Sequence, residues 1–307
     1  MNVRALLHRP IAALGAATLV ASLGTAVTVS AGAPASASAS TTPAATPTVT
    51  KVLVFVEENH SLSQMAASMP FVHDLATTYA YANNYTAVAH PSLPNYLAIA
   101  GGSTFGVTDD QNPSAHRIRG ASVFDQTLRA GRRARTYAQS QPRRCALTNA
   151  GSYAVRHNPW TYFAGRRAAC RRFDVGMAAF RRDAASGHLP AVGMVIPDVL
   201  HDAHDGSLAT ADAWLKKQIL KVQAGPDWNS GRLAIVITAD EDDRSQGNKV
   251  LTVVASKYQQ HKVVGTPLNH YSLTRFINDV TGTRYLRNAA TAPSMTEAFG
   301  VPTRPRP

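Results

Sequence analysis

Short runs of consecutive apolar residues alternate along this chain with longer segments in which apolar residues recur every three or four positions. The apolar runs predict buried strands, at 51–56, 135–138, 191–196, 233–238 and 250–255. The segments with helical spacing predict helices, at 62–80, 122–130, 208–222 and 271–280. Within the first of these, Pro70 is expected to break or restart the helix because proline lacks an N–H donor.

This alternation of strands and helices predicts the fold class. Continuously apolar strands are typical of parallel sheets that are covered on both faces. We therefore expect an α/β sandwich with a largely parallel central sheet flanked by helices. No internal repeat is visible, so a single domain at 51–300 with a short tail at 301–307 is the simplest interpretation.

The first fifty residues have a different pattern. A short basic region with Arg4 and Arg9 precedes an apolar stretch at 11–29, and Ala35-Ser36-Ala37 is a cleavage signature. We interpret 1–37 as a secretory signal peptide and the Ser/Thr/Ala/Pro-rich segment 38–50 as a linker. The alternative is an uncleaved membrane anchor. In either case we expect a secreted or cell-surface protein.

The chain has two cysteines, Cys145 and Cys170, which excludes a cysteine-dense scaffold and a four-cysteine zinc site. An exported protein meets an oxidising compartment, so we expect these cysteines to form a disulfide. The alternative is two free thiols.

Acidic, amide and imidazole side chains follow three of the predicted strands. Glu57, Glu58 and Asn59 follow the first strand, Asp198, Asp202 and His204 follow the strand at 191–196, and Asp240 to Asp243 follow the strand at 233–238. The carboxyl ends of parallel strands meet at one edge of a sheet. Clustered carboxylates repel one another unless a cation lies among them. The pattern predicts a divalent metal site, although each cluster alone would be an ordinary solvated loop.

A candidate nucleophile, Ser92, lies in the segment His90-Pro91-Ser92-Leu93-Pro94-Asn95-Tyr96. Proline is favoured in the first helical turn, so a helix should begin close to Ser92. Free N–H groups at a helix N-terminus favour an anion, and a hydroxyl placed there can attack phosphorus. The alternative is that Ser92 is only a helix cap.

Charge indicates an anionic partner. The formal net charge is +12, and fifteen arginines against two aspartates occupy 117–182. Such a segment could hold phosphate esters, an anionic membrane surface or, with less support, nucleic acid. The alternative is a solvated face in an arginine-biased protein.

Five motifs occur in order: Glu58-Asn59-His60-Ser61, His90-Pro91-Ser92-x-Pro94-Asn95-Tyr96, Tyr153-Ala154-x-x-His157-x-Pro159-Trp160, Asp202-x-His204-Asp205-Gly206-Ser207 and Asp240-Glu241-Asp242-Asp243. Together they resemble the bacterial phosphoesterase family of secreted acid phosphatases and phospholipases C, in the alkaline phosphatase superfamily. The likeness is greatest to short actinobacterial acid phosphatases that act on phosphatidylinositol 3-phosphate.

The resemblance implies a role for each matching residue. Glu58, Asn59, Asp240 and Glu241 match metal ligands, and Ser92 matches the nucleophile. His157 and His204 match histidines of the phosphate pocket, either of which would protonate the leaving alkoxide. Asn95, Asp202 and His270 are expected to bind substrate, although Asn95 would also suit a turn brace, His270 a helix cap and His157 a buried loop. Leu200 and Ala239 depart from the pattern; Leu200 stands where many two-metal members carry an Asp, which leaves a second metal in doubt, and Ala239 stands where similar proteins tend to carry Trp.

We therefore expect a metal-dependent phosphatase that hydrolyses phosphate monoesters through a phosphoserine intermediate, with phosphoinositide head groups among its candidate substrates. Two alternatives remain open from the sequence. One is a phosphodiesterase of phospholipase C type on the same site, and the other is a non-catalytic exported anion-binding protein.

Overall fold

The computed structural model describes residues 48–304, so the predicted signal peptide and residues 38–47 of the predicted linker lie outside the described part of the chain. Among the described residues, no helix is long and apolar enough to cross a membrane.

A central sheet of eight strands organises the described residues. The strand order is β5-β4-β6-β1-β7-β8-β2-β9. Their bounds are Asp174–Val175 (β5), Ala134–Ala138 (β4), Val192–Ile196 (β6), Lys51–Glu57 (β1), Leu233–Ala239 (β7), Thr252–Ala255 (β8), Ala80–Ala82 (β2) and Lys262–Val264 (β9). β8 is antiparallel to both neighbours and the other pairings are parallel, which confirms the expected largely parallel sheet. A separate pair joins β3 (Tyr85–Thr86) to β10 (Leu268–Asn269).

The two central strands explain why the sequence pattern was so clear. Val54 of β1 lies between Met194 of β6 and Val236 of β7 in register, and all three are buried. A strand covered on both faces must be apolar at every position, so it lacks the alternation of a half-exposed strand. The polar residues begin only where β1 and β7 leave the core, at their carboxyl ends.

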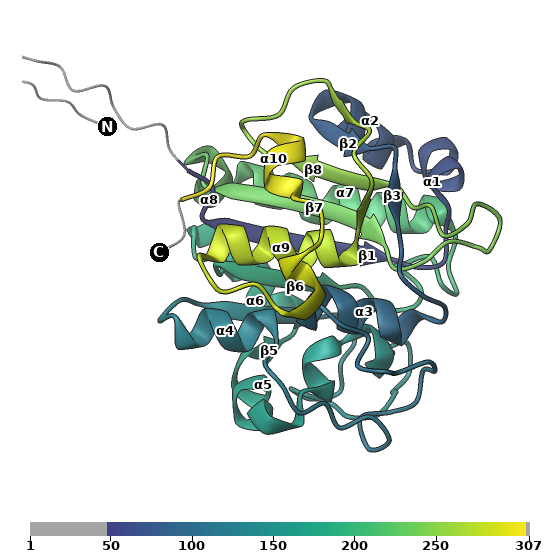
Figure 1. Ribbon diagram of the computed structural model, residues 1–307, viewed down its shortest axis with the longest axis vertical. Coiled ribbons are helices and arrows are strands. Elements are labelled where there is room, and N and C mark those ends of the chain that lie inside the picture. The colour runs from purple at the N-terminus through teal and green to yellow at the C-terminus, as the bar shows by residue number, and fades with distance from the viewer. Residues whose placement is uncertain (1–47, 305–307) are drawn as a thin grey trace, which may run out of the picture. The chain divides into compact units, whose positions relative to one another are not determined.

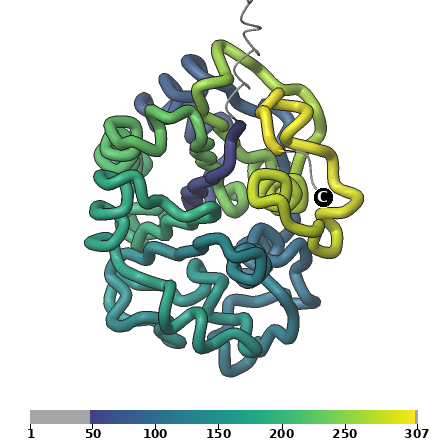
Figure 2. Tube along the Cα trace, turned by 90° about the vertical axis from the view of Figure 1, so that its left-hand side faces the viewer, coloured from purple at the N-terminus to yellow at the C-terminus, as the bar shows by residue number. Residues whose placement is uncertain are grey.

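Helices cover both faces of the sheet (Figures 1 and 2). One face carries α3 (Ser92–Gly101), α4 (Val123–Arg129), α9 (His270–Thr281) and α10 (Met295–Phe299). The other carries α1 (Leu62–Ser68), α2 (Pro70–Thr78), α6 (Met177–Ser186), α7 (Leu208–Ala224) and α8 (Pro226–Asn229). Helix α5 (Arg167–Phe173) packs beside β5 and β4, near the short helices η1 (Val155–His157), η2 (Pro159–Tyr162) and η3 (Ala164–Arg166), and η4 (Arg287–Ala290) packs against α9.

The fold confirms two expectations. The helical segment 62–80 is divided at Met69, so that α2 restarts at Pro70. Cys145 and Cys170 form a disulfide, as expected. The predicted domain bounds of 51 and 300 stay a prediction; just outside them, Val49 is buried and its N–H donates to Pro302 O over 2.7 Å. The two ends of the described chain therefore belong to the folded unit.

Candidate active site

Ser92 is the first residue of α3, and the turn before it is braced by Asn95. The Asn95 side-chain oxygen accepts hydrogen bonds from the N–H groups of Val88 and Ala89, both over 3.0 Å, and its nitrogen donates to Ala89 O over 2.9 Å. Pro91 occupies the cap position, and Ser92 Oγ donates to Glu58 Oε2 over 3.0 Å. The hydroxyl is therefore directed at the sheet edge and does not serve as a helix cap.

Glu58 follows β1 and is fully buried. Besides Ser92, its carboxylate accepts a hydrogen bond from Tyr96 Oη and lies 3.2 Å, through Oε2, from His157 Nε2. Burial by itself would raise the pKa of Glu58, but the charge and hydrogen bond of His157, together with Tyr96, lower it below its usual value. Glu58 is therefore held as a carboxylate beside the Ser92 hydroxyl.

His157 connects two carboxylates. Its Nδ1 lies 3.0 Å from Asp202 Oδ2, and its ring stacks on Tyr96 with centroids 5.2 Å apart. Burial opposes charge on the ring, but Glu58 and Asp202 raise the pKa of His157 to about 9. His157 is thus an imidazolium with both nitrogens engaged, and Asp202 holds this ring in place.

Asp240 and Glu241 follow β7 and face Glu58. Asp240 Oδ1 accepts hydrogen bonds from the N–H groups of Asn59, over 3.1 Å, and Glu241, over 2.7 Å. Burial and then the charge of Glu58 raise the pKa of Asp240 well above its usual value, and the same two causes raise the pKa of Glu241 to about 8. Three carboxyl groups thus surround Ser92 on neighbouring strand ends.

Two groups of residues can be compared as metal ligands. Among the described residues, Glu58, His157 and Asp202 form the set of three whose ligand atoms all lie within 4.8 Å of one another. In that set the His157 imidazolium already lies between the two carboxylates and offsets one of their negative charges. In the predicted set, Asn59 Oδ1 and Asp240 Oδ2 are buried and accept no hydrogen bond from any described residue. Carboxylate and amide oxygens without donors fit a divalent cation, so Glu58, Asn59, Asp240 and Glu241 remain a suitable set.

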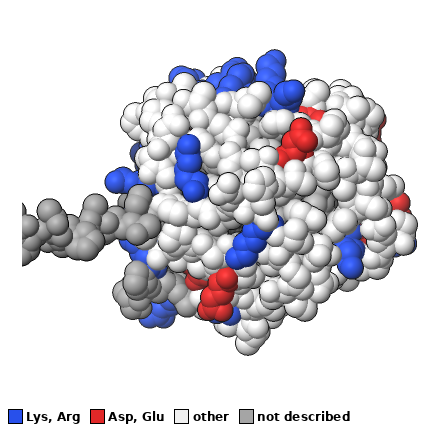
Figure 3. Space-filling model, turned by 90° about the horizontal axis from the view of Figure 1, so that it is seen from above, with Lys and Arg blue, Asp and Glu red and all other residues white. Residues whose placement is uncertain are grey.

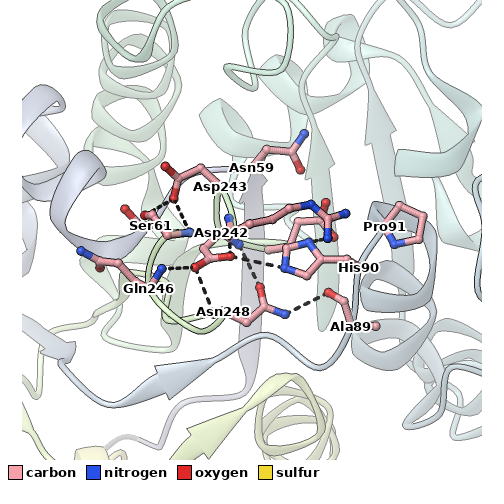
Figure 4. A network of polar contacts seen from close by, with 12 residues as sticks. Asn59, Ser61, Ala89, His90, Pro91, Asp242, Asp243, Gln246 and Asn248 are labelled. Atoms are coloured by element: carbon pink, nitrogen blue, oxygen red, sulfur yellow. Dashed lines mark hydrogen bonds and ion pairs between the residues drawn. The ribbon is translucent and has the colours of Figure 1, made fainter.

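The loop between β7 and β8 fastens this edge to the Ser92 turn (Figure 4). Asp242 accepts hydrogen bonds from the N–H groups of Gln246 and Asn248, and Asn248 Nδ2 donates to Ala89 O over 3.0 Å. His90 lies between Glu241 and Asp242, with its Nδ1 3.1 Å from Glu241 Oε2 and its Nε2 3.3 Å from Asp242 Oδ1. The residues on either side of Ser92 are therefore tied to the acidic cluster.

Two predicted substrate-binding residues have other partners. Both nitrogens of the buried His270 are engaged, Nδ1 with Tyr85 Oη at 3.0 Å and Nε2 with Asp240 O at 2.6 Å. Burial lowers its pKa to about 4, so the ring is neutral and supports Asp240 from behind. The amide of Asn95 is occupied by its own turn and by Glu241, to whose Oε2 the Asn95 Nδ2 donates over 3.3 Å. The structure thus favours the bracing role for Asn95. The His270 ring supports the backbone of Asp240, because its two nitrogens are engaged with Tyr85 Oη and Asp240 O.

His204 lies at the rim. Its Nδ1 is 2.6 Å from Asp205 Oδ1 and its Nε2 is 3.0 Å from Arg156 Nη2. The ring centroid lies 6.0 Å from that of His157, and the side chain is 31% exposed, against 1% for His157. Of the two candidate proton donors, His204 is the one that is exposed to solvent.

Sequence reasoning did not assign His90, Tyr96 or Arg156. Tyr96 lies in the same motif as Ser92. Its position four residues after Ser92 places both side chains on one face of a helix, and this spacing is a sequence signal for a shared site. Arg156 was counted only as one of fifteen arginines, yet its charge helps to lower the pKa of Glu58. Only the fold shows that this arginine reaches the site.

Most other arginines of 117–182 are exposed to solvent or form structural hydrogen bonds and ion pairs. Arg132 donates to Thr50 O and Val280 O, and Arg135 pairs with Asp183. On the β9 side of the molecule, which Figure 3 shows, Lys and Arg gather along one edge and most of the surface is uncharged. The basic charge is therefore distributed unevenly.

Comparison with known proteins shows which sequences are similar to this chain. A family model described as the phosphoesterase family matches residues 54–283. The chain is 31% identical over 260 residues to a phosphatidylinositol-3-phosphatase of Mycobacterium tuberculosis, covering 82% of this chain and 84% of that protein. It is 28% identical over 202 residues to a phosphate-repressible acid phosphatase of Penicillium chrysogenum, covering 62% of this chain and 49% of that protein, so it spans about half of the fungal relative's length.

Solved structures share the fold. A protein of the alkaline phosphatase superfamily from Vibrio parahaemolyticus has a TM-score of 0.57 at 12% identity, covering 82% of this chain and 72% of that one. A phosphonate monoester hydrolase from Silicibacter pomeroyi has a TM-score of 0.53 at 12% identity, covering 83% and 77%. The extent of the family match and the identity to the mycobacterial protein lead to one conclusion: this chain belongs to the phosphoesterase family and has the α/β fold of the alkaline phosphatase superfamily.

Proposed function

We propose that this protein is a phosphatase that hydrolyses phosphate monoesters with Ser92 as its nucleophile. The observation that carries the proposal is the hydrogen bond from Ser92 Oγ to Glu58 Oε2 at the first residue of α3. Few roles require a buried serine hydroxyl at a helix N-terminus, surrounded by carboxylates that follow two neighbouring strands. The relatives named as phosphatases support the same reaction class.

The reaction divides into two displacements. Ser92 Oγ attacks phosphorus while its proton passes to Glu58, and the bond between phosphorus and the ester oxygen breaks. His204 would give a proton to the departing alkoxide from Nε2, which requires that substrate displaces Arg156 from that nitrogen. Water then attacks the phosphoserine and gives a proton to His204, Glu58 returns its proton to the departing Ser92 oxygen, and inorganic phosphate is released. The Ser92 N–H at the start of α3 would face the developing negative charge, since the Leu93 N–H donates to Asp110 Oδ1 over 2.9 Å and Pro94 has no N–H.

Glu58, Asn59, Asp240 and Glu241 are proposed to hold a divalent cation. When bound, such an ion lowers the pKa of a hydroxyl and neutralises charge on phosphoryl oxygens. The unpartnered oxygens of Asn59 and Asp240 support this assignment. Tyr96 fixes Glu58 and Asp202 fixes His157, so this chain supplies a preorganised site.

The substrate is proposed to be the phosphate of a phosphoinositide, in line with the mycobacterial relative. Arg156 at the rim would contact an anionic head group as it enters the site. Export is proposed from the N-terminal pattern, and the disulfide agrees with an oxidising compartment. Detection of the protein in the culture medium, with Ser38 as its N-terminus, would test export.

The decisive experiment compares the hydrolysis of an aryl phosphate monoester with that of the matching diester, using residues 38–307. Ser92→Ala should lower monoester turnover by at least about 10³-fold, because it removes the nucleophile. Ser294→Ala is the matched control, since Ser294 caps α10 and has no contact with the site. Chelation should lower turnover, and an added divalent cation should restore it.

Other outcomes would redirect the proposal. Preference for the diester would indicate a phosphodiesterase on the same residues. Full activity in Ser92→Ala would exclude the phosphoserine route. No turnover of either ester by folded, metal-loaded protein would leave the anion-binding alternative.

A further inference from the structure

A basic cleft lies between α6 and α7, on the face of the sheet opposite to α3. Its volume is about 510 Å³, and its lining includes Arg181 from α6, Lys217 and Lys221 from α7, and His201 from the loop after β6. No residue that we place around Ser92 lines it. The cleft is therefore a separate feature of the molecule.

The charges of this cleft are unbalanced. No carboxylate is among the residues that line it. Within residues 48–304, none of Arg181, Lys217 and Lys221 forms an ion pair with Asp or Glu. Cations gathered around one cavity repel one another, and an anion between them would relieve that repulsion.

The side chain of Gln218, which lines the cleft, has a buried polar atom without a partner among the described residues. Gln218 is 5% exposed and lines the cleft, and its Oε1 accepts no hydrogen bond from any described residue. Buried amide oxygens normally have a donor. A ligand that carries a hydroxyl beside its phosphate would supply one.

An apolar groove continues from the cleft. A second cavity of about 430 Å³ shares Arg181 and Lys221 with the first, and its other lining residues are Ala185, Ala224 and Gly225. Lys217, Leu220, Lys221 and Ala224 are spaced for one face of α7, and Leu220 is 48% exposed. Arg181 and Lys221 therefore lie between the polar cleft and the apolar groove.

We propose that the cleft between α6 and α7 is a second binding site for a phosphate-bearing ligand, independent of Ser92. Arg181, Lys217 and Lys221 contact the phosphate, and Gln218 accepts a hydrogen bond from a ligand hydroxyl. The ligand is either a free phosphate ester or the head group of a lipid whose chains enter the apolar groove.

The test uses calorimetric titration in a Ser92→Ala background, which prevents consumption of ester ligands. The three probes are inorganic phosphate, glycerol 3-phosphate and dihexanoyl phosphatidic acid below its aggregation limit. The test variant is Arg181→Gln with Lys221→Gln. The matched control is Arg182→Gln with Lys216→Gln, which makes the same charge change on the same helices outside the cleft.

The test variant should lose one bound glycerol 3-phosphate per chain, or bind it at least about tenfold more weakly, while the control keeps it. Tighter binding of the lipid than of glycerol 3-phosphate, lost in the test variant, would identify a lipid head group. Equal binding would identify a free phosphate ester. Identical stoichiometry and affinity in the test variant and the control would overturn the proposal. All four substituted residues are exposed, and circular dichroism would confirm folding.

Discussion

At the scale of single residues, the site depends on how Glu58 is held. Its two oxygens receive different partners, Tyr96 on Oε1 and both Ser92 and His157 on Oε2. A buried carboxylate that retains its charge needs such donors, because burial by itself favours the neutral acid. Of these three partners, Tyr96 can be tested most cleanly, because removing its hydroxyl group takes away the contact with Glu58 and keeps the ring.

Tyr96→Phe should therefore lower kcat by about 10-fold, as expected when a group that orients a ligand is lost. The free energy of unfolding should fall by about 1 kcal/mol. Tyr162→Phe is the control, because the buried Tyr162 Oη donates to Gln111 O over 3.0 Å. Comparable destabilisation with unchanged kcat is expected there. Equal losses of kcat in the two variants would show that Tyr96 acts through stability alone.

At the scale of elements, one buried carboxylate holds the segment that carries His157. Asp174 at the start of β5 accepts hydrogen bonds from Thr136, from Asn158 and from the N–H of Cys145. The Cys145–Cys170 disulfide closes the same segment covalently. His157 is therefore positioned by a loop anchored at both ends.

Asp174 should make stability depend on pH. Burial raises its pKa to about 6, above the value near 3.8 of the unfolded chain, so the folded state binds the proton more tightly. Stability from this group is present below about pH 4 and is lost as the pH rises through 6, by up to about 3 kcal/mol. Asp174→Asn should remove this slope, which urea unfolding of both proteins at pH 4 and 7 would measure. Parallel pH profiles would contradict the assignment.

Removing the disulfide should destabilise the protein. Cys145→Ala with Cys170→Ala frees a loop with a sequence separation of 25, which should cost about 3 kcal/mol of unfolding free energy. Wild-type protein in reductant should approach the stability of this variant, and the variant itself should not respond to reductant. A wild-type protein indifferent to reductant would contradict the prediction.

At the scale of the whole molecule, the net charge of +10 that remains for residues 38–307, once Arg4 and Arg9 are removed from the +12 of the full chain, should steer anionic substrates toward the site. We expect kcat/KM for an aryl phosphate to fall by about 10-fold between 10 mM and 500 mM salt, because screening shortens the range of the field. Arg156→Gln should raise KM more than Arg144→Gln, since Arg144 is exposed and has no contact with the site. Salt-independent kinetics would contradict steering.

The sequence by itself determined the strands β1, β4, β6, β7 and β8, the largely parallel sheet, the position of Ser92 and the acidic residues after β1 and β7, but the short strands β2, β5 and β9 were not predicted. These follow from local patterns: a doubly covered strand is wholly apolar, and its polar residues begin at its end. The disulfide followed from the expected compartment and the presence of just two cysteines.

Only the tertiary structure decided which of these residues meet. Asn95 and His270 were expected to bind substrate, but their polar atoms are satisfied by groups distant in sequence or within a turn. His90 and Arg156 become part of the site because the β7–β8 loop and the segment around η1 return to it. The cleft between α6 and α7 likewise has no sequence signature, because its cations come from separate helices. These contacts join residues that are distant in sequence, so they depend on tertiary packing and cannot be predicted from a local sequence pattern.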